Sequence, residues 1–335
     1  MSLSSLPEVE ESLALQHAQD QEEVAAQLAL GLLPMWYILN PDDLEGTTLA
    51  WLIAVMPLIQ KAFEQSQHLT GVFINDYRAA ALATADPLNI ELPDVDRPLD
   101  VPDSHWDTFD FDGPLIKVDP FDHDEVSRNM VVNGPSRVMA GMDQKTLEEA
   151  MTTGLHTSSG AAIRQAVNGS RSLTRSVADS DPRILGYARV TDGNPCYYCA
   201  ILASRGAVYR DDSFVASDAQ FSGPDISDLG DNWSDVAKVH DNCRCTLRPV
   251  YTKAHFRDRE AWFYYEQWKE FSRGKSNAKA IREYRKRFVR YPREDAKIVN
   301  LADIRNRRNS LIQAGFDEDS DQVLMAERLE RRLAA

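Results

Sequence analysis

The sequence has no apolar run long enough to cross a membrane as a helix. Its most apolar stretch, LAWLIAVMPLI, covers 11 residues from Leu49 to Ile59, whereas a membrane-spanning helix needs about 20. The first residues, MSLSSLPEVEESLALQ, are acidic, so the chain also lacks the basic segment and apolar run of a secretory signal. These two absences predict a soluble protein made in a cytoplasm, where thiols stay mostly reduced.

Positive charge is scarce over the chain as a whole. The 335 residues carry 37 Lys and Arg against 52 Asp and Glu, a net charge of −15, which argues against attraction of the whole surface to nucleic acid or anionic lipid. Hydrophobic residues make up 43% of the chain, enough to bury a core, so the protein is not disordered as a whole. The length predicts two domains, or one domain with long extensions, and no internal repeat is visible.

Cysteine is also scarce, and its four residues fall in two short clusters, DGNPCYYC at 192–199 and KVHDNCRC at 238–245. A C-x2-C turn points two sulfurs the same way, and zinc takes four nitrogen or sulfur ligands in a tetrahedron. The spacing therefore predicts a structural zinc ion that joins two strand ends across a loop. Two other interpretations stay open, namely buried free thiols beside a core histidine and a disulfide formed in an oxidising medium. The five candidate ligands are Cys196, Cys199, His240, Cys243 and Cys245.

A catalytic site built on the same residues has less support in the sequence. A catalytic metal needs an open coordination position and a nearby acid or base; Asp241 is adjacent, but no H-x-E deaminase signature is present. Ser204, His240 and an aspartate would make a protease triad on paper. The segment NPCYYC lacks the strand–helix context of a thioredoxin motif.

Residues 1–85 are predicted to be helical. Apolar residues recur at spacings of three to four from Glu8 to Leu33, and further helices are predicted over 44–64 and 69–84. Pro57 is expected to kink or split the middle helix. The segment NPDDLEG marks a turn and a helix start, with Asn40 or Asp42 as the cap.

Residues 86–128 form a Pro-rich acidic linker that is expected to be extended. Up to residue 125 it holds six prolines and thirteen acidic residues against two basic ones. Its interleaved aromatic residues are unusual for a disordered linker, so it is expected to lie against a partner or against its own domain. A solvated linker with a few anchoring aromatics is the other interpretation.

Residues 129–251 are predicted to form a small α+β domain. Asp143 is the expected cap of one helix, and Ser158 or Ser159 the start of the next, which Gly169 would end. RILGYARV, residues 183–190, and CRCTLRPVY, which ends at residue 251, are the two strand candidates. A short helix, AILASRG, and a polar loop separate them.

Residues 252–335 are predicted to be a helical tail with a basic first half. Residues 253–293 carry thirteen Lys or Arg and five Asp or Glu, which is +8 and leaves −23 for the rest. A basic segment of this kind is able to contact nucleic acid through phosphates, but a solvated amphipathic helix is the favoured interpretation. The candidate nucleic-acid-binding residues are Arg282, Arg285, Lys286, Arg287 and Arg290.

Two segments of the chain, ARVTDGNPCYYCAILASRGAVY and VHDNCRCTLRPVY, together resemble the phage Mu F-like minor head proteins, most of all the actinophage branch. The H-x-N-C-R-C ending, His240 to Cys245, carries most of the resemblance, which covers about residues 135–251. The expected fold is therefore α+β: mostly helical, with a Cys/His-stapled Mu F-like domain and helical extensions at both ends.

The resemblance implies a minor capsid protein of a tailed phage that acts in head morphogenesis. Such a protein associates with the portal and other head proteins, lies in the virion at the head interior or portal vertex, and takes part in DNA packaging or ejection. Contact with packaged DNA through the basic tail is a further expectation, and no membrane partner is expected. The alternatives are a capsid maturation protease or a zinc-dependent hydrolase, and, third, a host-directed toxin.

Overall fold

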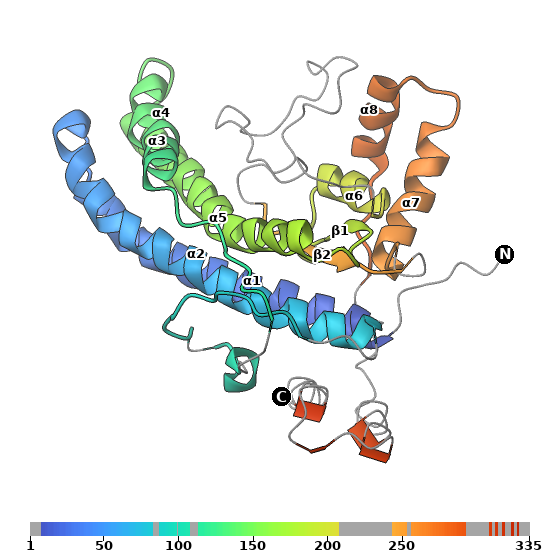
Figure 1. The fold of residues 1–335 in the computed structure, drawn as a ribbon. Coiled ribbons are helices and arrows are strands. Elements are labelled where there is room, and N and C mark those ends of the chain that lie inside the picture. Colours follow the sequence, from blue (N-terminus) through green and yellow to red (C-terminus); the bar gives the residue numbers. More distant parts are fainter. Residues whose placement is uncertain are drawn as a thin grey trace.

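The protein is mostly helical, with one small sheet. The computed structural model describes residues 8–82, 87–98, 100–107, 113–207, 243–252 and 256–292, and short pieces between 308 and 327. Two long helices, α1 (Glu8–Met35) and α2 (Leu44–Leu82), pack side by side, and a third, α5 (Leu147–Ser180), runs along them and packs on both (Figure 1). The mostly helical α+β class expected from the sequence is confirmed. The smaller elements are η1 (Trp36–Ile38), η2 (Asp103–Trp106), α3 (His123–Asn133), α4 (Pro135–Gly141), β1 (Gly186–Val190), α6 (Tyr197–Ser204), β2 (Thr246–Val250), α7 (Arg259–Ser272) and α8 (Asn277–Arg287).

The core of the long helices draws on widely separated parts of the chain. One cluster joins α1 and α2 residues such as Leu28 and Val55 to Val138 and Ala162 from α4 and α5. Trp36 and Trp51 meet edge to face, with ring centroids 5.7 Å apart. The predicted N-terminal helical region and the predicted Mu F-like region therefore share one hydrophobic core.

Helix α2 runs without a break through the position where two helices were expected. Pro57 lies inside it and is exposed, so the expected split at this proline is wrong. The polar run Gln65–His68 that separated the two predicted helices is helical too, because its side chains are hydrogen-bonded in the interior: the Ser66 hydroxyl donates to the Gln21 side chain at 2.6 Å. By length and composition alone α2 passes as a membrane span, with an 18-residue window of mean hydropathy 1.3 of which 33% is buried. A single helix of this kind is weak evidence for a membrane span, and α2 also packs on α1 and α5.

The caps of α2 and α5 differ from the predicted ones by one to three residues. Asp43, rather than Asn40 or Asp42, precedes α2, and its carboxylate accepts the Gly46 N–H at 3.0 Å. Thr146, rather than Asp143, caps α5 and forms a reciprocal capping box with Glu149. Because aspartate and threonine both accept helix N–H groups well, composition alone does not choose among neighbouring candidates.

Helix α5 is continuous where the sequence predicted two shorter helices. Ser158 lies inside it and donates its hydroxyl to the Leu155 carbonyl, so neither Ser158 nor Ser159 begins a helix. Gly169 does not end one either. A Cβ placed at Gly169 would lie 2.2 Å from the carbonyl oxygen of Phe63, so the glycine allows α5 and α2 to cross at close range.

The acidic segment between α2 and α3 lies against its own helices, which was one of the two expectations for it. Trp106 is buried, and the Asp20 carboxylate of α1 meets the His105 ring at 2.9 Å. Leu88 is held through both its N–H and its carbonyl by the side chain of Asn75. Side chains of α2 thus satisfy backbone groups that have no ladder partners of their own.

The two strands pair antiparallel, with Ala188 opposite Arg248, and every residue of both strands is buried. Both predicted strands are confirmed in shortened form. Helix α5 supports the ribbon, and α6 lies at its other side (Figure 1). Beyond it α7 and α8 pack on α6 through an aromatic cluster centred on Tyr264 and Tyr284.

Candidate metal centre

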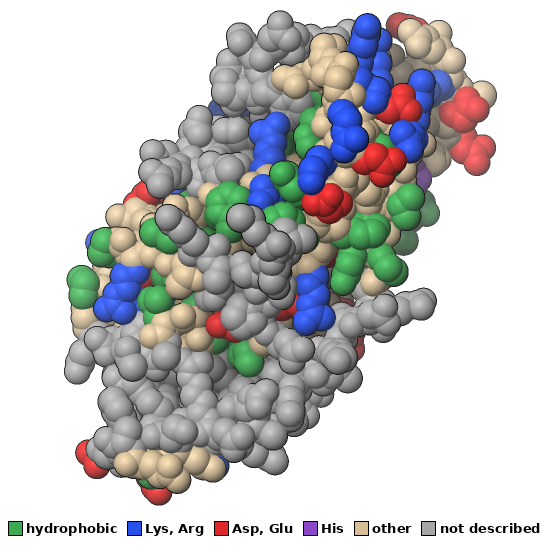
Figure 2. Space-filling model, turned by 90° about the vertical axis from the view of Figure 1, so that its right-hand side faces the viewer, with side chains coloured by type: hydrophobic (Ala, Val, Ile, Leu, Met, Phe, Trp, Pro, Cys, Tyr) green, Lys and Arg blue, Asp and Glu red, His purple; other side chains and the backbone are tan. Residues whose placement is uncertain are grey.

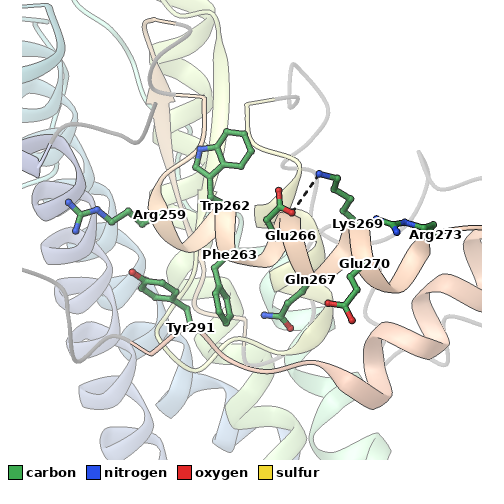
Figure 3. Close-up of a pocket in the computed structure, with 9 residues that line it drawn as sticks. All are labelled: Arg259, Trp262, Phe263, Glu266, Gln267, Lys269, Glu270, Arg273 and Tyr291. Atoms are coloured by element: carbon green, nitrogen blue, oxygen red, sulfur yellow. Dashed lines mark ion pairs between the residues drawn. The ribbon is translucent and has the colours of Figure 1, made fainter. Parts of the chain in front are cut away.

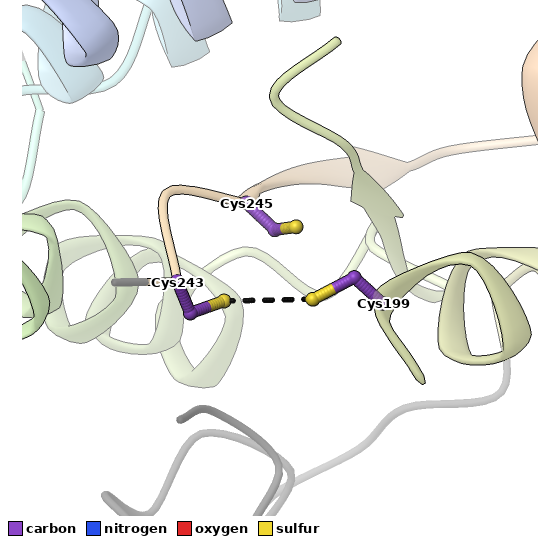
Figure 4. A group of neighbouring side chains, drawn as sticks. All are labelled: Cys199, Cys243 and Cys245. Carbon is purple, nitrogen blue, oxygen red and sulfur yellow. Dashed lines mark hydrogen bonds between the residues drawn. The ribbon is translucent and has the colours of Figure 1, made fainter. Parts of the chain in front are cut away.

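Three buried cysteines meet at the base of the ribbon. Cys199 lies in the first turn of α6, while Cys243 and Cys245 lie on the chain entering β2 (Figure 4). Their sulfur atoms all lie within 4.8 Å of one another, and Cys199 Sγ is 3.8 Å from Cys243 Sγ. All four cysteines of the chain are free thiols. The pairing of the two sequence clusters predicted from their spacing is therefore present in the fold.

The remaining two candidate ligands, Cys196 and His240, are not part of this three-sulfur group. Cys196 caps α6, and its sulfur accepts the Cys199 N–H at 3.4 Å. It is half-buried and packs against the three-cysteine group, although it is not within 4.8 Å of all three sulfurs. His240 lies outside the described residues, so its predicted role is untested.

The three sulfurs fit a tetrahedral ion of the size of zinc. With Zn–S bonds of about 2.3 Å, the edges of a tetrahedron of sulfurs measure about 3.8 Å, and the Cys199–Cys243 separation is 3.8 Å. Thiolates are the ligands that soft and borderline ions select. The three buried cysteines can hold a metal ion, and Cys196 packs against them.

Two arginines surround the Cys243 sulfur. Arg171 of α5 donates through Nη2 to the carbonyl oxygens of Cys243 and Cys245, both at 3.0 Å, and to the Cys243 sulfur at 3.4 Å. Arg189 of β1 approaches the same sulfur at 3.7 Å through Nη1. Sequence reasoning missed both arginines, which are 72 and 54 residues from Cys243. The one feature of the sequence that pointed to either arginine was the alternating pattern of the predicted strand, which placed Arg189 on one of its faces.

The environment favours a thiolate at Cys243. Hydrogen bonds from the Cys199 and Cys245 thiols, together with Arg171 and Arg189, lower the pKa of Cys243 well below its usual value. The hydrogen bonds that Cys199 makes to Cys196 and Cys243 raise the pKa of Cys199. Burial also lowers the pKa of Arg171. Cysteine binds metals as the thiolate, so binding a cation at this cluster would release thiol protons.

The five basic residues predicted to meet nucleic acid lie on α8 and just after it, and all are exposed. Arg287 stacks over Phe271 at 4.1 Å and pairs with Glu270, and Arg285 lies over the Tyr197 ring at 5.5 Å. Arg290 donates to the Pro195 carbonyl at 3.3 Å. Figure 2 shows Lys and Arg gathered over this part of the molecule with Asp and Glu among them. Their role in binding nucleic acid stays a prediction.

A groove of about 580 Å³ runs along the outer side of α7 (Figure 3). Trp262, Phe263 and Tyr291 form its apolar part. Its charged side chains are largely paired, as in the Lys269–Glu266 contact at 3.6 Å. The groove therefore presents aromatic surface with balanced charge rather than a convergent set of catalytic groups.

The protease alternative required Ser204 as a nucleophile. Ser204 is buried at the end of α6, and its hydroxyl donates to the Ile201 carbonyl at 2.7 Å, a contact within the helix. Its proposed base, His240, lies outside the described residues. The Ser204 hydroxyl is thus engaged within its own helix, and the proposed triad stays untested.

A family model described as VG15 protein matches residues 127–271. The match runs from α3 to near the end of α7, covers less than half of the chain, and includes all four cysteines and both arginines. It indicates a phage-encoded protein, without specifying a Mu F-like minor head protein. No curated protein and no solved structure matches the chain.

Proposed function

We propose that the chain is a minor structural protein of a tailed-phage head, portal-associated, that acts in procapsid assembly and in DNA packaging or ejection. The observation that carries the proposal is the match to the phage family VG15 over residues 127–271. That span contains the C-x2-C and H-x-N-C-R-C segments, on which the resemblance to Mu F-like minor head proteins also rests. We place the protein at the head interior or portal vertex.

The proposed role of the cysteine cluster is structural. A zinc ion bound by it would fix the start of α6 to the start of β2, two segments that the chain itself joins only through residues 205–245. Cys199, Cys243 and Cys245 are each 1–2% exposed, so the cluster offers no open side to a substrate. Buried, closed sulfur sites are typical of structural zinc.

The proposed contact with another head protein lies at the end of the molecule opposite α7 and α8 (Figure 1). Among the described residues, fourteen large hydrophobic side chains are exposed and ten of them lie at this apolar end, where Leu49 and Ile53 are both 67% exposed. Such concentrations of exposed apolar surface mark interaction sites. The apolar end consists of Leu30, Leu33, Tyr37, Ile38, Leu49, Ile53, Val132, Met139, Met142 and Leu147.

The charged residues around the apolar end limit the kind of partner that can bind there. Acidic side chains flank the half of the apolar end that holds Leu49 and Ile53, where Asp42, Asp43 and Glu45 are exposed, whereas Arg137 and Lys145 are exposed at its α4 half. The acidic half disfavours an anionic lipid, since like charges repel at close range. The occupant we propose for it is an apolar surface on another head protein, ringed by Lys and Arg, with the portal as the first candidate.

Incorporation into heads tests this proposal. The chain would be produced together with the portal and major coat proteins of the phage that encodes it, and purified particles assayed for it. We expect the double variant Leu49→Asp, Ile53→Asp to be lost from particles. Val289→Asp, which changes a side chain 61% exposed near α8, should be retained. Equal retention of both variants, or absence of the unaltered chain from particles, would refute the proposal.

Metal analysis tests the structural ion. The purified chain should contain one zinc per molecule, and a chelator should lower its melting temperature because a structural ion binds the folded state only. A chain without metal, and with a melting temperature that a chelator does not change, would refute the zinc proposal.

A further inference from the structure

Cys196 differs from the other three cysteines in being partly exposed. Its side chain is half-buried, whereas Cys199, Cys243 and Cys245 are each 1–2% exposed. The buried sulfurs lie behind it, since Cys196 packs against the three-cysteine group. A reagent that approaches the cluster from solvent therefore meets the Cys196 sulfur first.

The C-x2-C pair lies at a junction between a strand and a helix. NPCYYC was expected to lack this context, and that expectation is wrong: β1 ends at Val190, and Cys196 is the cap residue that precedes α6. The Cys199 N–H donates to the Cys196 sulfur at 3.4 Å, and the two side chains are hydrogen-bonded to each other. Pairs with this spacing at the start of a helix form the reversible disulfides of thiol-exchange proteins. Cys199 is thus placed to react with a group that forms at the Cys196 sulfur.

Two arginines flank Cys196. Arg290 donates to the carbonyl oxygen of Pro195 at 3.3 Å, and the Arg285 guanidinium lies 5.5 Å from the centroid of the Tyr197 ring. Both arginines are exposed, and α8, which carries Arg285, holds five Lys or Arg and one Glu. Reactive cysteines are typically found in partly exposed, electropositive surroundings of this kind. The positive charge favours a reagent that carries negative charge, because it raises the local concentration of that reagent.

We propose that Cys196 is a thiol–disulfide exchange site for small anionic disulfides, and that Cys199 resolves the product into an intramolecular disulfide. In the first step the Cys196 sulfur attacks one sulfur of the reagent RSSR, which gives Cys196–S–SR and releases RSH with the thiol proton. In the second step the Cys199 sulfur attacks the Cys196 sulfur, and the second RSH leaves with the Cys199 proton. The pair loses two electrons and two protons, which reduce one molecule of RSSR to two thiols.

The exchange would also open the proposed metal site. Cys199 is one of the three sulfurs that can hold an ion, and a sulfur in a disulfide is no longer a thiolate ligand. Oxidation of the pair should therefore release the ion. This consequence rests on the zinc ion of the proposed function, whereas the exchange itself does not. A chain assembled in a reducing cytoplasm and later exposed to an oxidising medium would pass from a metal-held to a disulfide-held cluster.

Reaction of the purified full-length chain with one equivalent of dithiobis(nitrobenzoate), an anionic disulfide with a coloured leaving group, tests the exchange. Trypsin leaves Cys196 and Cys199 in one peptide, residues 190–205, and puts Cys243 and Cys245 in two others. We expect both coloured thiolates of each reagent molecule to be released, and peptide 190–205 to be recovered two hydrogens lighter and without label. A label that stays on the chain, or a disulfide between two different peptides, would overturn the proposal.

Two variants separate the roles of the pair. Cys199→Ser should keep the label at Cys196 and release one coloured thiolate per reagent, because the resolving sulfur is missing. Cys196→Ser should react at least about tenfold more slowly, since buried thiols are inert. Cys245→Ser is the control and should release both thiolates as the wild type does. Loss of the label from Cys199→Ser, or a wild-type rate in Cys196→Ser, would overturn the assignment; where circular dichroism shows a variant to be unfolded, the wild-type peptide masses decide.

The charge of the reagent tests the arginines. The double variant Arg285→Gln, Arg290→Gln should slow the reaction with the anionic reagent by about two- to tenfold at low salt, and leave the reaction with neutral hydroxyethyl disulfide unchanged. Arg137→Gln, Lys145→Gln is the matched control, because it removes the same charge from exposed side chains at the end of the molecule opposite α8 (Figure 1). Equal slowing in both double variants would refute the preference for an anionic disulfide.

A fluorescent zinc indicator in the same reaction reports release of the ion. Zinc should appear together with the coloured thiolate in the wild type, and far more slowly in Cys196→Ser. A chain that holds no zinc yet forms the disulfide between Cys196 and Cys199 would refute the proposed zinc and leave the exchange intact. A zinc-containing chain in which this pair does not react would refute the exchange alone.

Discussion

The crossing of α5 over α2 at Gly169 leads to a prediction whose size follows from one distance. A Cβ at this position would lie 2.2 Å from the Phe63 carbonyl oxygen and 3.1 Å from its carbon, whereas ordinary contacts begin near 3.4 Å. Gly169→Ala would therefore force two helix backbones apart by more than 1 Å. Neither atom belongs to a flexible side chain that can rotate away.

The expected cost combines two opposing effects. Overpacking in a core costs about 1–3 kcal/mol, and a clash between backbones belongs at the upper end, about 3 kcal/mol. Alanine in a helix interior is favoured over glycine by about 1 kcal/mol. The free energy of unfolding should thus fall by about 2 kcal/mol in Gly169→Ala.

A second glycine provides the matched control. At Gly31 of α1 the nearest atom to an added Cβ is Leu58 Cδ1 at 3.7 Å, an ordinary contact. Gly31→Ala should therefore stabilise the protein by up to about 1 kcal/mol. Urea unfolding followed by far-ultraviolet circular dichroism measures both variants. A Gly169→Ala protein as stable as the wild type, or a loss of similar size in Gly31→Ala, would refute the close-crossing argument.

Three further predictions concern stability. Arg78→Met leaves the buried Asp181 carboxylate without its partner at 2.8 Å and should lower the free energy of unfolding in urea by about 3–5 kcal/mol. Lys61→Met, which breaks an ion pair at the surface, should lower it by less than about 1 kcal/mol. A similar decrease in both variants would contradict this prediction. Burial raises the pKa of Tyr77 from 10 to about 12. The resulting contribution to the free energy of unfolding, at most about 3 kcal/mol, is present below pH 10 and is lost as the pH rises to 12. Tyr77→Phe should therefore lose less stability at alkaline pH than the wild type, and an unchanged profile of stability against pH would count against this prediction. Thr146→Ala removes the α5 capping box and should lower the unfolding free energy by about 1 kcal/mol, and an unaltered urea midpoint would argue that the box contributes nothing.

The sequence located the cysteine site better than it located the helix ends. Cys196 and Cys199 share a turn, and Cys243 and Cys245 precede a strand, so their spacing alone predicted that sulfurs would converge. The charge that balances them was not predictable in the same way. Arg171 belongs to a stretch with no link in sequence to the cysteines, and only the packing of α5 on β2 brings it to Cys243.

The errors in helix length have a common physical cause. Pro57 and Gly169 were expected to interrupt or end helices because of their own backbone preferences. In the structure both helices continue through these residues: Pro57 is exposed within α2, and Gly169 lies directly against the Phe63 backbone of α2. Helix propensities give the free-energy penalty of proline or glycine within a helix, but they carry no information about the packing of a neighbouring helix that offsets this penalty.

The polar run at the middle of α2 is also helical because of tertiary contacts that the sequence did not reveal. Gln67 and His68 were expected to lie between two helices, yet Gln67 donates to the Asp119 carbonyl at 2.7 Å and His68 meets the Pro93 carbonyl at 2.9 Å. Both acceptors belong to the acidic segment, which has few backbone partners of its own. The polar side chains that seemed to break α2 are therefore what holds that segment in place.

Helix α5 links the two features on which the proposed function depends. Near its start, Gly154 lies under Trp36 and Val138 close to the apolar end, and a Cβ there would be 2.3 Å from Val138 Cγ2. About 25 Å further along, at about 1.5 Å per residue, Arg171 contacts the cysteine cluster. A continuous helix packed against α1 and α2 transmits position rather than motion. The proposed docking surface and the proposed metal site, connected by this one helix, suit the proposed role of a protein that sets the spacing between neighbours in an assembly.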